Sequence, residues 1–119
     1  MTLQHVLGVF AHPDDETIMA GGTLACLGAR GLTTHVASAT RGEGGEAGEP
    51  PLGPLEELGQ VRADELACAA AALGGASLTF LDYVDPRVGP KDELYAFTDD
   101  LDRLAAEVAA VIRQVGAQV

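Results

Sequence analysis

The stretch that decides the fold is Ala11-His12-Pro13-Asp14-Asp15-Glu16, a polar turn that follows the apolar run His5–Phe10 and precedes a helix-like segment. An apolar run that ends in a polar turn before a helix predicts a β-strand of an open α/β sheet, with reactive groups presented at its carboxyl end. One imidazole and two carboxylates, from His12, Asp14 and Asp15, therefore crowd a single turn.

Two interpretations of this turn are open. In the first, it supplies two metal ligands and a base, because zinc accepts imidazole and carboxylate and a catalytic zinc site uses three protein ligands and a water. In the second, it is a plain helix start, with Pro13 in the first turn, Asp14 or Asp15 capping free N–H groups and His12 solvated. Adjacent carboxylates repel unless a cation or separate donors hold them, which favours the first interpretation.

Apolar patterning along the chain predicts three successive strand-helix units. The expected strands cover residues 5–10, 32–39 and 77–83, and the expected helices cover residues 16–30, 55–73 and 98–115. The last helix repeats its apolar residues at three- and four-residue steps until Gly116, which is typical of an amphipathic helix with a glycine stop. The predicted fold class is α/β, a Rossmann-like three-layer α/β/α arrangement with a mainly parallel sheet.

Right-handed crossovers place the three strands in the order three, two, one. The first strand then has a free side, and Gly116–Val119 is expected to be the entry to a fourth strand. Residues 1–119 are accordingly expected to form one domain that lacks its C-terminal part. Without a fourth strand, the open apolar edge of the first strand favours pairing with another chain, and so a homo-oligomer.

Several motifs together resemble one protein family. The hexapeptide, placed between a strand and a helix, is similar to the signature of the LmbE-like/PIG-L family of zinc-dependent N-acetylglucosaminyl deacetylases. Weaker matches follow in order along the chain, at Thr40-Arg41-Gly42-Glu43, Arg62-Ala63-Asp64-Glu65-Leu66, Leu73-Gly74 and Leu81-Asp82-Tyr83-Val84-Asp85. The resemblance spans nearly the whole chain and implies the N-terminal half of the LmbE-like fold.

The resemblance also implies roles for the residues of the hexapeptide. By this match, His12 and Asp15 bind Zn²⁺, and Asp14 is the general base. Zinc lowers the pKa of bound water and polarises an acetyl carbonyl, while a carboxylate within reach takes the proton of the water. The implied activity is hydrolysis of the amide C–N bond of an N-acetylated amino sugar or glycoside, which releases acetate and a free amine.

The histidine content departs from the family pattern. The family takes a third zinc ligand from a histidine in a later segment, together with a histidine that stabilises the oxyanion. The histidines of this sequence are His5, His12 and His35, and none follows His35. The third ligand and the oxyanion-stabilising histidine are therefore missing. His5 and His35 lie within strand patterns and are predicted to be surface or half-buried strand residues, not ligands.

Arg62, Asp85 and Glu43 are the residues predicted to bind substrate. The resemblance suggests contacts of Arg62 and Asp85 with sugar hydroxyls or a phosphate, and Glu43 belongs to the matched motif after the second strand. Each has a plainer alternative. Arg62 can form a helical ion pair with Glu65, Asp85 can belong to an Asp-Pro turn, and Glu43 can be a solvated acid.

Residues 42–54 are predicted to form a loop, because glycines and prolines dominate this stretch. The loop leaves the carboxyl end of the second strand, on the same rim as His12. It could therefore act as a mobile flap over substrate. The alternative is a solvated acidic connector without a role, which is favoured for Glu46 and Glu49.

Composition restricts the partners. The formal net charge is −11, from 18 acidic residues against 7 Lys and Arg, which disfavours nucleic acid and anionic membrane surfaces and suits a neutral small-molecule sugar. The sequence shows no transmembrane run and no secretory signal, so a cytoplasmic location is expected. Cys26 and Cys68 lack metal-like spacing and are predicted to be buried free thiols of a reducing compartment.

Two other classes of function compete with the deacetylase. A Rossmann-like nucleotide binder is disfavoured, because the first strand is followed by two acids where a glycine-rich phosphate loop would be needed. A non-catalytic interaction module, a half-domain that needs a partner chain to complete its sheet, is the main alternative. Zinc binding with acetate release would support the enzyme, and a stable zinc-free oligomer would support the module.

Overall fold

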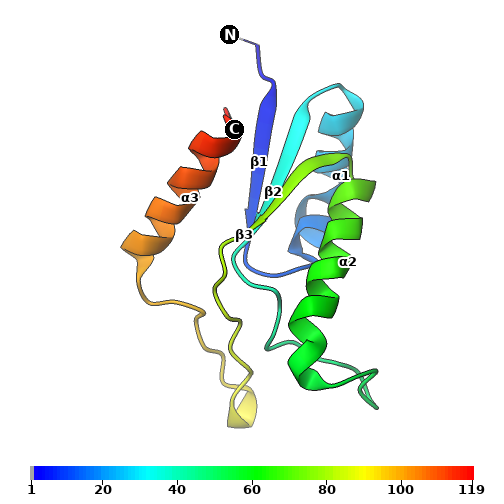
Figure 1. Ribbon diagram of the computed structural model, residues 1–119, viewed down its shortest axis with the longest axis vertical. Helices are drawn as coiled ribbons and strands as arrows, with labels where there is room; N and C mark the ends of the chain where they lie inside the picture. Colours follow the sequence, from blue (N-terminus) through cyan, green and yellow to red (C-terminus); the bar gives the residue numbers. More distant parts are fainter. Residues whose placement is uncertain (1) are drawn as a thin grey trace.

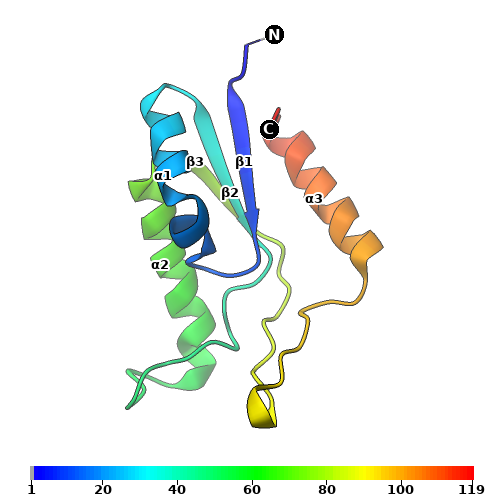
Figure 2. The same ribbon diagram turned by 180° about the vertical axis from the view of Figure 1, so that it is seen from behind.

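The computed structural model describes residues 2–119. Its elements in chain order are β1 (His5–Phe10), α1 (Asp15–Ala29), β2 (Thr33–Ser38), the 3-10 turn η1 (Leu55–Glu57), α2 (Leu58–Ala72), β3 (Gly75–Phe80), the 3-10 turn η2 (Pro90–Asp92) and α3 (Leu101–Val115). The strands form one parallel sheet in the order β1-β2-β3. Helices α1 and α2 cover one face and α3 lies against the other (Figures 1 and 2). The predicted three-layer α/β class and strand order are confirmed.

The strand and helix bounds differ from the prediction mainly at β3 and α3. β3 covers 75–80 instead of 77–83, because Gly75 already pairs with Thr34 and the left-handed backbone of Asp82 (φ 61°) ends the extended run. α3 begins at Leu101 instead of residue 98. There the side chain of Asp100 accepts a hydrogen bond from the backbone N–H of Arg103 at 2.9 Å, which is an N-cap.

The main core lies between β2 and the α1–α2 layer. Its buried members are Leu24, Val36, Leu66 and Ala70. Val36 comes from the central strand and is 2% exposed, as is Leu66 of α2. Burial of large side chains at this level stabilises each by about 1.5–3 kcal/mol, so this cluster is what fixes the two helices on the sheet.

Cys26 of α1 and Cys68 of α2 are free thiols, as predicted, but their predicted burial is wrong because both are exposed. Each helix buries only the stripe that faces β2, and the two cysteines lie off that stripe. Apolar neighbours in the sequence therefore did not indicate a buried position.

All three α-helices have 15 residues, and within residues 2–119 no helix is long and apolar enough to cross a bilayer.

β1 lies at the point of the sheet where the chain changes from one side to the other. The chain steps from β1 to β2 to β3 with helices on one face, and α3 returns on the other face toward the free side of β1 (Figure 1). There Gln118 N–H donates to His5 O at 3.0 Å and Leu7 N–H donates to Val119 O at 2.8 Å. Residues 118–119 thus lie where the fourth strand was predicted to begin, although they form no regular strand.

The carboxyl ends of the strands are level with one another. In the parallel register Phe10 pairs with Ser38, and Ser38 with Phe80. The segments that follow all three strands therefore meet at one rim of the sheet. Open α/β sheets bind ligands at this rim where the strand order reverses, and β1 brings the hexapeptide to that point.

Candidate active site

The turn after β1 has an unusual backbone that is fixed by hydrogen bonds. Asp14 has φ 102° and ψ −26°, a conformation uncommon for a residue other than glycine. The Glu16 carboxylate accepts hydrogen bonds from Asp14 N–H at 3.0 Å and from the Thr17 hydroxyl at 2.7 Å. On the other side, the Thr40 hydroxyl donates to Ala11 O at 2.9 Å. Such a fixed, strained turn is typical of a functional site.

Glu16 and Thr40 are the residues that sequence reasoning missed. Glu16 is only 1% exposed and Thr40 is fully buried, so both are internal supports of the turn. The signal for Glu16 was its place as the last acid of the hexapeptide, at the first turn of α1. Thr40 opens a motif that the sequence singled out, but only the structure shows that its hydroxyl also accepts Gly42 N–H at 3.2 Å.

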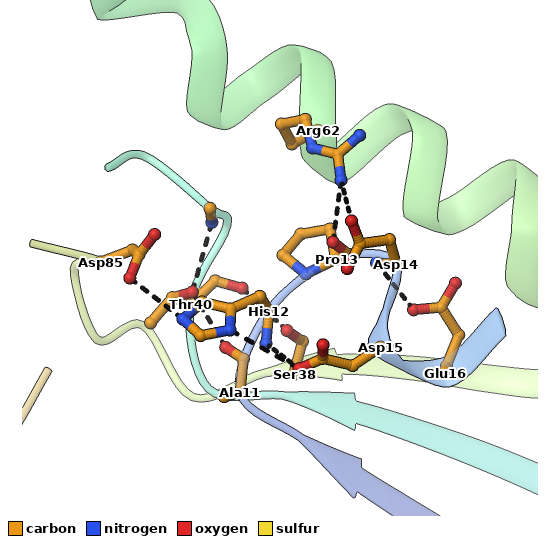
Figure 3. Close-up of polar contacts among 11 residues, drawn as sticks. Ala11, His12, Pro13, Asp14, Asp15, Glu16, Ser38, Thr40, Arg62 and Asp85 are labelled. Atoms are coloured by element: carbon orange, nitrogen blue, oxygen red, sulfur yellow. Dashed lines mark hydrogen bonds and ion pairs between the residues drawn. The ribbon is translucent and has the colours of Figure 1, made fainter. Parts of the chain in front are cut away.

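His12 lies between two carboxylates (Figure 3). Its Nε2 is 3.1 Å from Asp85 Oδ1, and its Nδ1 is 3.5 Å from Asp15 Oδ2. The backbone N–H of His12 also donates to Asp15 Oδ2 at 3.0 Å. The imidazole is 44% exposed, whereas the Asp85 side chain is only 14% exposed. The ring is therefore held on both edges while remaining accessible.

Asp14 is paired with Arg62 of α2. Arg62 Nη2 lies 3.1 Å from Asp14 Oδ2 and donates to Pro13 O at 2.8 Å (Figure 3). Its Nη1 donates to Glu65. Arg62 thus forms the predicted helical ion pair with Glu65 and also reaches the rim, while its predicted contact with substrate stays a prediction. Asp14 occupies the N-cap position of α1, but its side chain makes no capping hydrogen bond. The adjacent acids have separate partners, Arg62 for Asp14 and His12 for Asp15.

Glu43 joins the segments that follow β2 and β3. Its Oε2 accepts hydrogen bonds from the backbone N–H groups of Arg41 and Asp85, both at 3.1 Å. The side chain packs over Gly59, where a Cβ would lie 2.9 Å from Glu43 Cγ. The structure therefore gives Glu43 a bracing role, and its predicted contact with substrate stays a prediction.

An open cleft of about 630 Å³ lies over these groups. Its polar lining includes His12, Asp14, Arg62 and Asp85, and its other side includes Val88, Leu94 and Tyr95. Gly42, Gly44, Gly45 and Glu46 of the predicted loop also line it, which confirms that this loop lies on the His12 rim. The volume is in the usual range for small-molecule sites. Predicted binding residues Arg62 and Asp85 thus share one cleft with the hexapeptide.

The donor set fits part of a metal site. His12 Nδ1 and Asp15 Oδ2 face each other, and imidazole with carboxylate is a combination that zinc accepts. Across residues 2–119, however, no three His, Cys, Asp or Glu side chains gather as a metal-binding group. The assignment of His12 and Asp15 as zinc ligands therefore stays a prediction.

The other two histidines lie away from this rim, on the sheet face toward α3. His5 Nδ1 is 3.2 Å from His35 Nε2, and His35 Nδ1 is 2.7 Å from the Ser77 hydroxyl. His35 is 8% exposed, and burial, followed by the neighbouring His5, lowers its pKa below the ordinary value of 6.5. His5 is half-buried, as predicted, but the prediction that His35 is a surface or half-buried residue is wrong, because it lies on the central strand β2 and is buried.

Comparison with known proteins matches residues 7–119 to the family model described as PIG-L, GlcNAc-PI de-N-acetylase. The chain belongs to the PIG-L family. Two curated relatives of this PIG-L chain, from Thermobispora bispora and Thermobifida fusca, are each named 1D-myo-inositol 2-acetamido-2-deoxy-alpha-D-glucopyranoside deacetylase. Both are 39% identical to it over its whole length, and it spans 44% and 46% of their lengths.

Solved structures extend the comparison of the PIG-L chain. N,N'-diacetylchitobiose deacetylase from Pyrococcus horikoshii, complexed with an inhibitor, matches with a TM-score of 0.62 and 32% identity over 69% of this chain and 30% of that one. GalB, the 4-carboxy-2-hydroxymuconate hydratase from Pseudomonas putida KT2440, matches with a TM-score of 0.72 and 28% identity over 97% of this chain and 45% of that one. The fold thus occurs with two different reactions.

Proposed function

We propose that this chain carries the catalytic turn of a zinc-dependent N-deacetylase, which hydrolyses the acetamide of an N-acetylated amino sugar or glycoside. The observation that carries the proposal is His12, placed at the cleft between Asp15 and Asp85 with Asp14 beside it. The names of the T. bispora and T. fusca relatives support the same substrate class.

The residues divide the work in the following way. His12 Nδ1 and Asp15 would hold zinc, which when bound lowers the pKa of a water and polarises the acetyl carbonyl. Asp14 would accept a proton from the attacking water while the water oxygen bonds to the acetyl carbon. The C–N bond then breaks, and the proton passes to the departing amine. Arg62 keeps the Asp14 carboxylate oriented toward the cleft.

Substrate binding is assigned to the same cleft. Arg62 is the proposed donor to sugar hydroxyls, and the Asp85 carboxylate oxygen that does not contact His12 is the proposed acceptor. Glu43 holds the backbone N–H of Asp85. The net charge of −11 favours a neutral small molecule over a nucleic acid or an anionic membrane surface. We also propose that the enzyme acts in the cytoplasm.

A second candidate function is hydration of a carbon–carbon double bond, favoured by the structural match to GalB. Both reactions add the elements of water to their substrate. They differ in substrate, because a hydratase acts on an unsaturated acid and releases no acetate.

The decisive experiment is zinc titration of the metal-stripped chain at neutral pH, followed by assays for acetate release from N-acetylglucosaminyl-inositol and N,N'-diacetylchitobiose. Zinc binding that depends on His12 and Asp15, with acetate release that disappears in Asp14→Asn, is expected. Asp64→Asn is the matched control, because Asp64 of α2 accepts only a hydrogen bond from Gln60. Neither zinc binding nor acetate release, from a folded chain, would reject the deacetylase and favour the interaction module.

A further inference from the structure

We infer that Asp85 is a positioning residue for His12, whose carboxylate selects the imidazole tautomer that leaves Nδ1 unprotonated toward Asp15. Glu43 supports this arrangement by holding the backbone of Asp85. The inference deepens the proposed function, on which its consequence for zinc rests. The selection of the tautomer itself depends only on contacts within this chain.

The tautomer follows from the chemistry of the contact. An ionised carboxylate has only acceptors, so the 3.1 Å approach of His12 Nε2 to Asp85 Oδ1 requires the proton on Nε2. A neutral ring then carries its lone pair on Nδ1, the nitrogen that faces Asp15 Oδ2 at 3.5 Å. Since a metal binds the unprotonated nitrogen, Asp85 directs the metal to the side of the ring where the second ligand lies.

The position of Asp85 is itself fixed by the fold. Leu81 N–H donates to Ser38 O and Tyr83 N–H donates to Ala39 O, both at 3.0 Å, so the segment after β3 follows β2 beyond the strand. Glu43 then accepts Asp85 N–H at 3.1 Å. The Asp85 carboxylate therefore approaches His12 from an anchored backbone.

This role is distinct from the plain Asp-Pro turn and from direct substrate binding. A turn residue would have no need for a carboxylate that is 14% exposed and aimed at an imidazole. Figure 3 shows one carboxylate oxygen of Asp85 bonded to His12 and the other directed away from the ring. Substrate can contact the oxygen that points away from the ring, while Oδ1 is occupied by His12.

The test begins with the tautomer of His12 in the metal-free chain, read from ring ¹⁵N chemical shifts at a pH where the ring is neutral. The native chain is expected to show the Nε2–H form. Asp85→Ala and Asp85→Asn are expected to give a mixture with the Nδ1–H form. The matched control is Asp82→Asn, because Asp82 pairs with Arg41 and not with His12. An Nδ1–H ring in the native chain, or the same tautomer in all variants, would overturn the inference.

Zinc affinity gives the second readout. We expect Asp85→Ala to weaken binding by about 10–100-fold, the effect typical of losing a carboxylate behind a ligating histidine, while Asp82→Asn binds like the native chain. Equal zinc affinity in Asp85→Ala would overturn the inference and leave the deacetylase proposal intact. Failure of the native chain to bind zinc would instead reject the proposed function, and the tautomer would still decide the role of Asp85.

Glu43→Ala tests the supporting contact. It is expected to shift the His12 tautomer in the same direction as Asp85→Ala, but by less, because the Asp85 side chain remains. Glu43→Gln keeps an acceptor for the two backbone amides and is expected to restore the native tautomer. Native ring shifts in Glu43→Ala would contradict the bracing role of Glu43.

Discussion

The two histidine environments of this protein use the same side chain in opposite ways. At the rim, His12 is 44% exposed and each ring nitrogen faces a carboxylate. On the sheet face, His35 is 8% exposed and its ring nitrogens face His5 and Ser77. The difference teaches that a histidine becomes a reactive or metal-binding group through charged partners and access to a cleft. Burial with neutral partners makes the same ring part of the interior.

The largest expected contrast is between His12→Ala and His35→Ala. His12→Ala should abolish zinc binding with little loss of stability, because the ring is half-exposed. His35→Ala should keep zinc binding but lower the free energy of unfolding by about 1–3 kcal/mol, since it leaves a cavity and an unpaired Ser77 hydroxyl. Calorimetric zinc titration and urea unfolding measure the two effects. Zinc binding by His12→Ala would break the comparison.

Within the rim, Asp14→Asn separates the proposed base from the proposed metal ligands. We expect turnover to fall by about 10²–10⁴-fold, the usual contribution of a general base, with zinc affinity unchanged. Asn tolerates positive φ, so it should keep the backbone of the turn. Acetate release and zinc titration on the same preparation are the measurements. Asp15→Ala should instead lose the zinc, and unaltered turnover in Asp14→Asn would remove Asp14 from the mechanism.

A glycine pair tests whether the rim is packed more tightly than the helix layer. A Cβ on Gly44 would lie 2.2 Å from Pro86 O, whereas a Cβ on Gly22 of α1 would meet open space. Gly44→Ala should therefore destabilise the protein by about 1–3 kcal/mol, and Gly22→Ala should stabilise it by about 0.5–1 kcal/mol. Urea unfolding of both variants gives the answer. A neutral Gly44→Ala would show that the two loops are free to separate.

The smallest expected effect is the pH dependence that His35 contributes to stability. Its pKa in the folded protein lies below the ordinary value of 6.5 because of burial and the adjacent His5. Between those two values the unfolded chain binds more protons, so this stability is complete above pH 6.5 and declines as the pH falls below it. Thermal melts from pH 7.5 to 5 should show this slope in the native protein and a shallower one in His35→Ala. Identical slopes would assign the effect to other groups.

The sequence was most informative where pattern and packing agree. β1 was predicted with its observed bounds, because its apolar run ends abruptly at the polar turn. β3 was misplaced because apolar residues continue through Tyr83, although the backbone at Asp82 is left-handed. Cys26 and Cys68 were predicted to be buried from their neighbours along the chain, which carry no information about the angle at which a helix meets its sheet.

The sequence predicted which residues gather at the site better than it predicted which of them contact one another. His12, Asp14, Arg62 and Asp85 meet at one cleft, as the rim argument required. The link from Asp85 to His12 joins residues 73 positions apart, and such a contact depends on strand register. No spacing rule expresses it. The buried role of Glu16 was hidden for a related reason, since a capping acid and an internal acid look alike in sequence.

The anchoring of residues 81–85 also limits how this chain can change length. Hydrogen bonds to Ser38, Ala39 and Glu43 fix this segment at three points, and His12 receives its far end. One added residue there would swing the acid off the imidazole. By contrast, the stretch around Leu52 and Gly53 is open, with Leu52 fully exposed and no atom within 4 Å of a Cβ at Gly53. The glycine- and proline-rich loop is therefore expected to tolerate insertions and deletions, whereas the path from β3 to the rim is not.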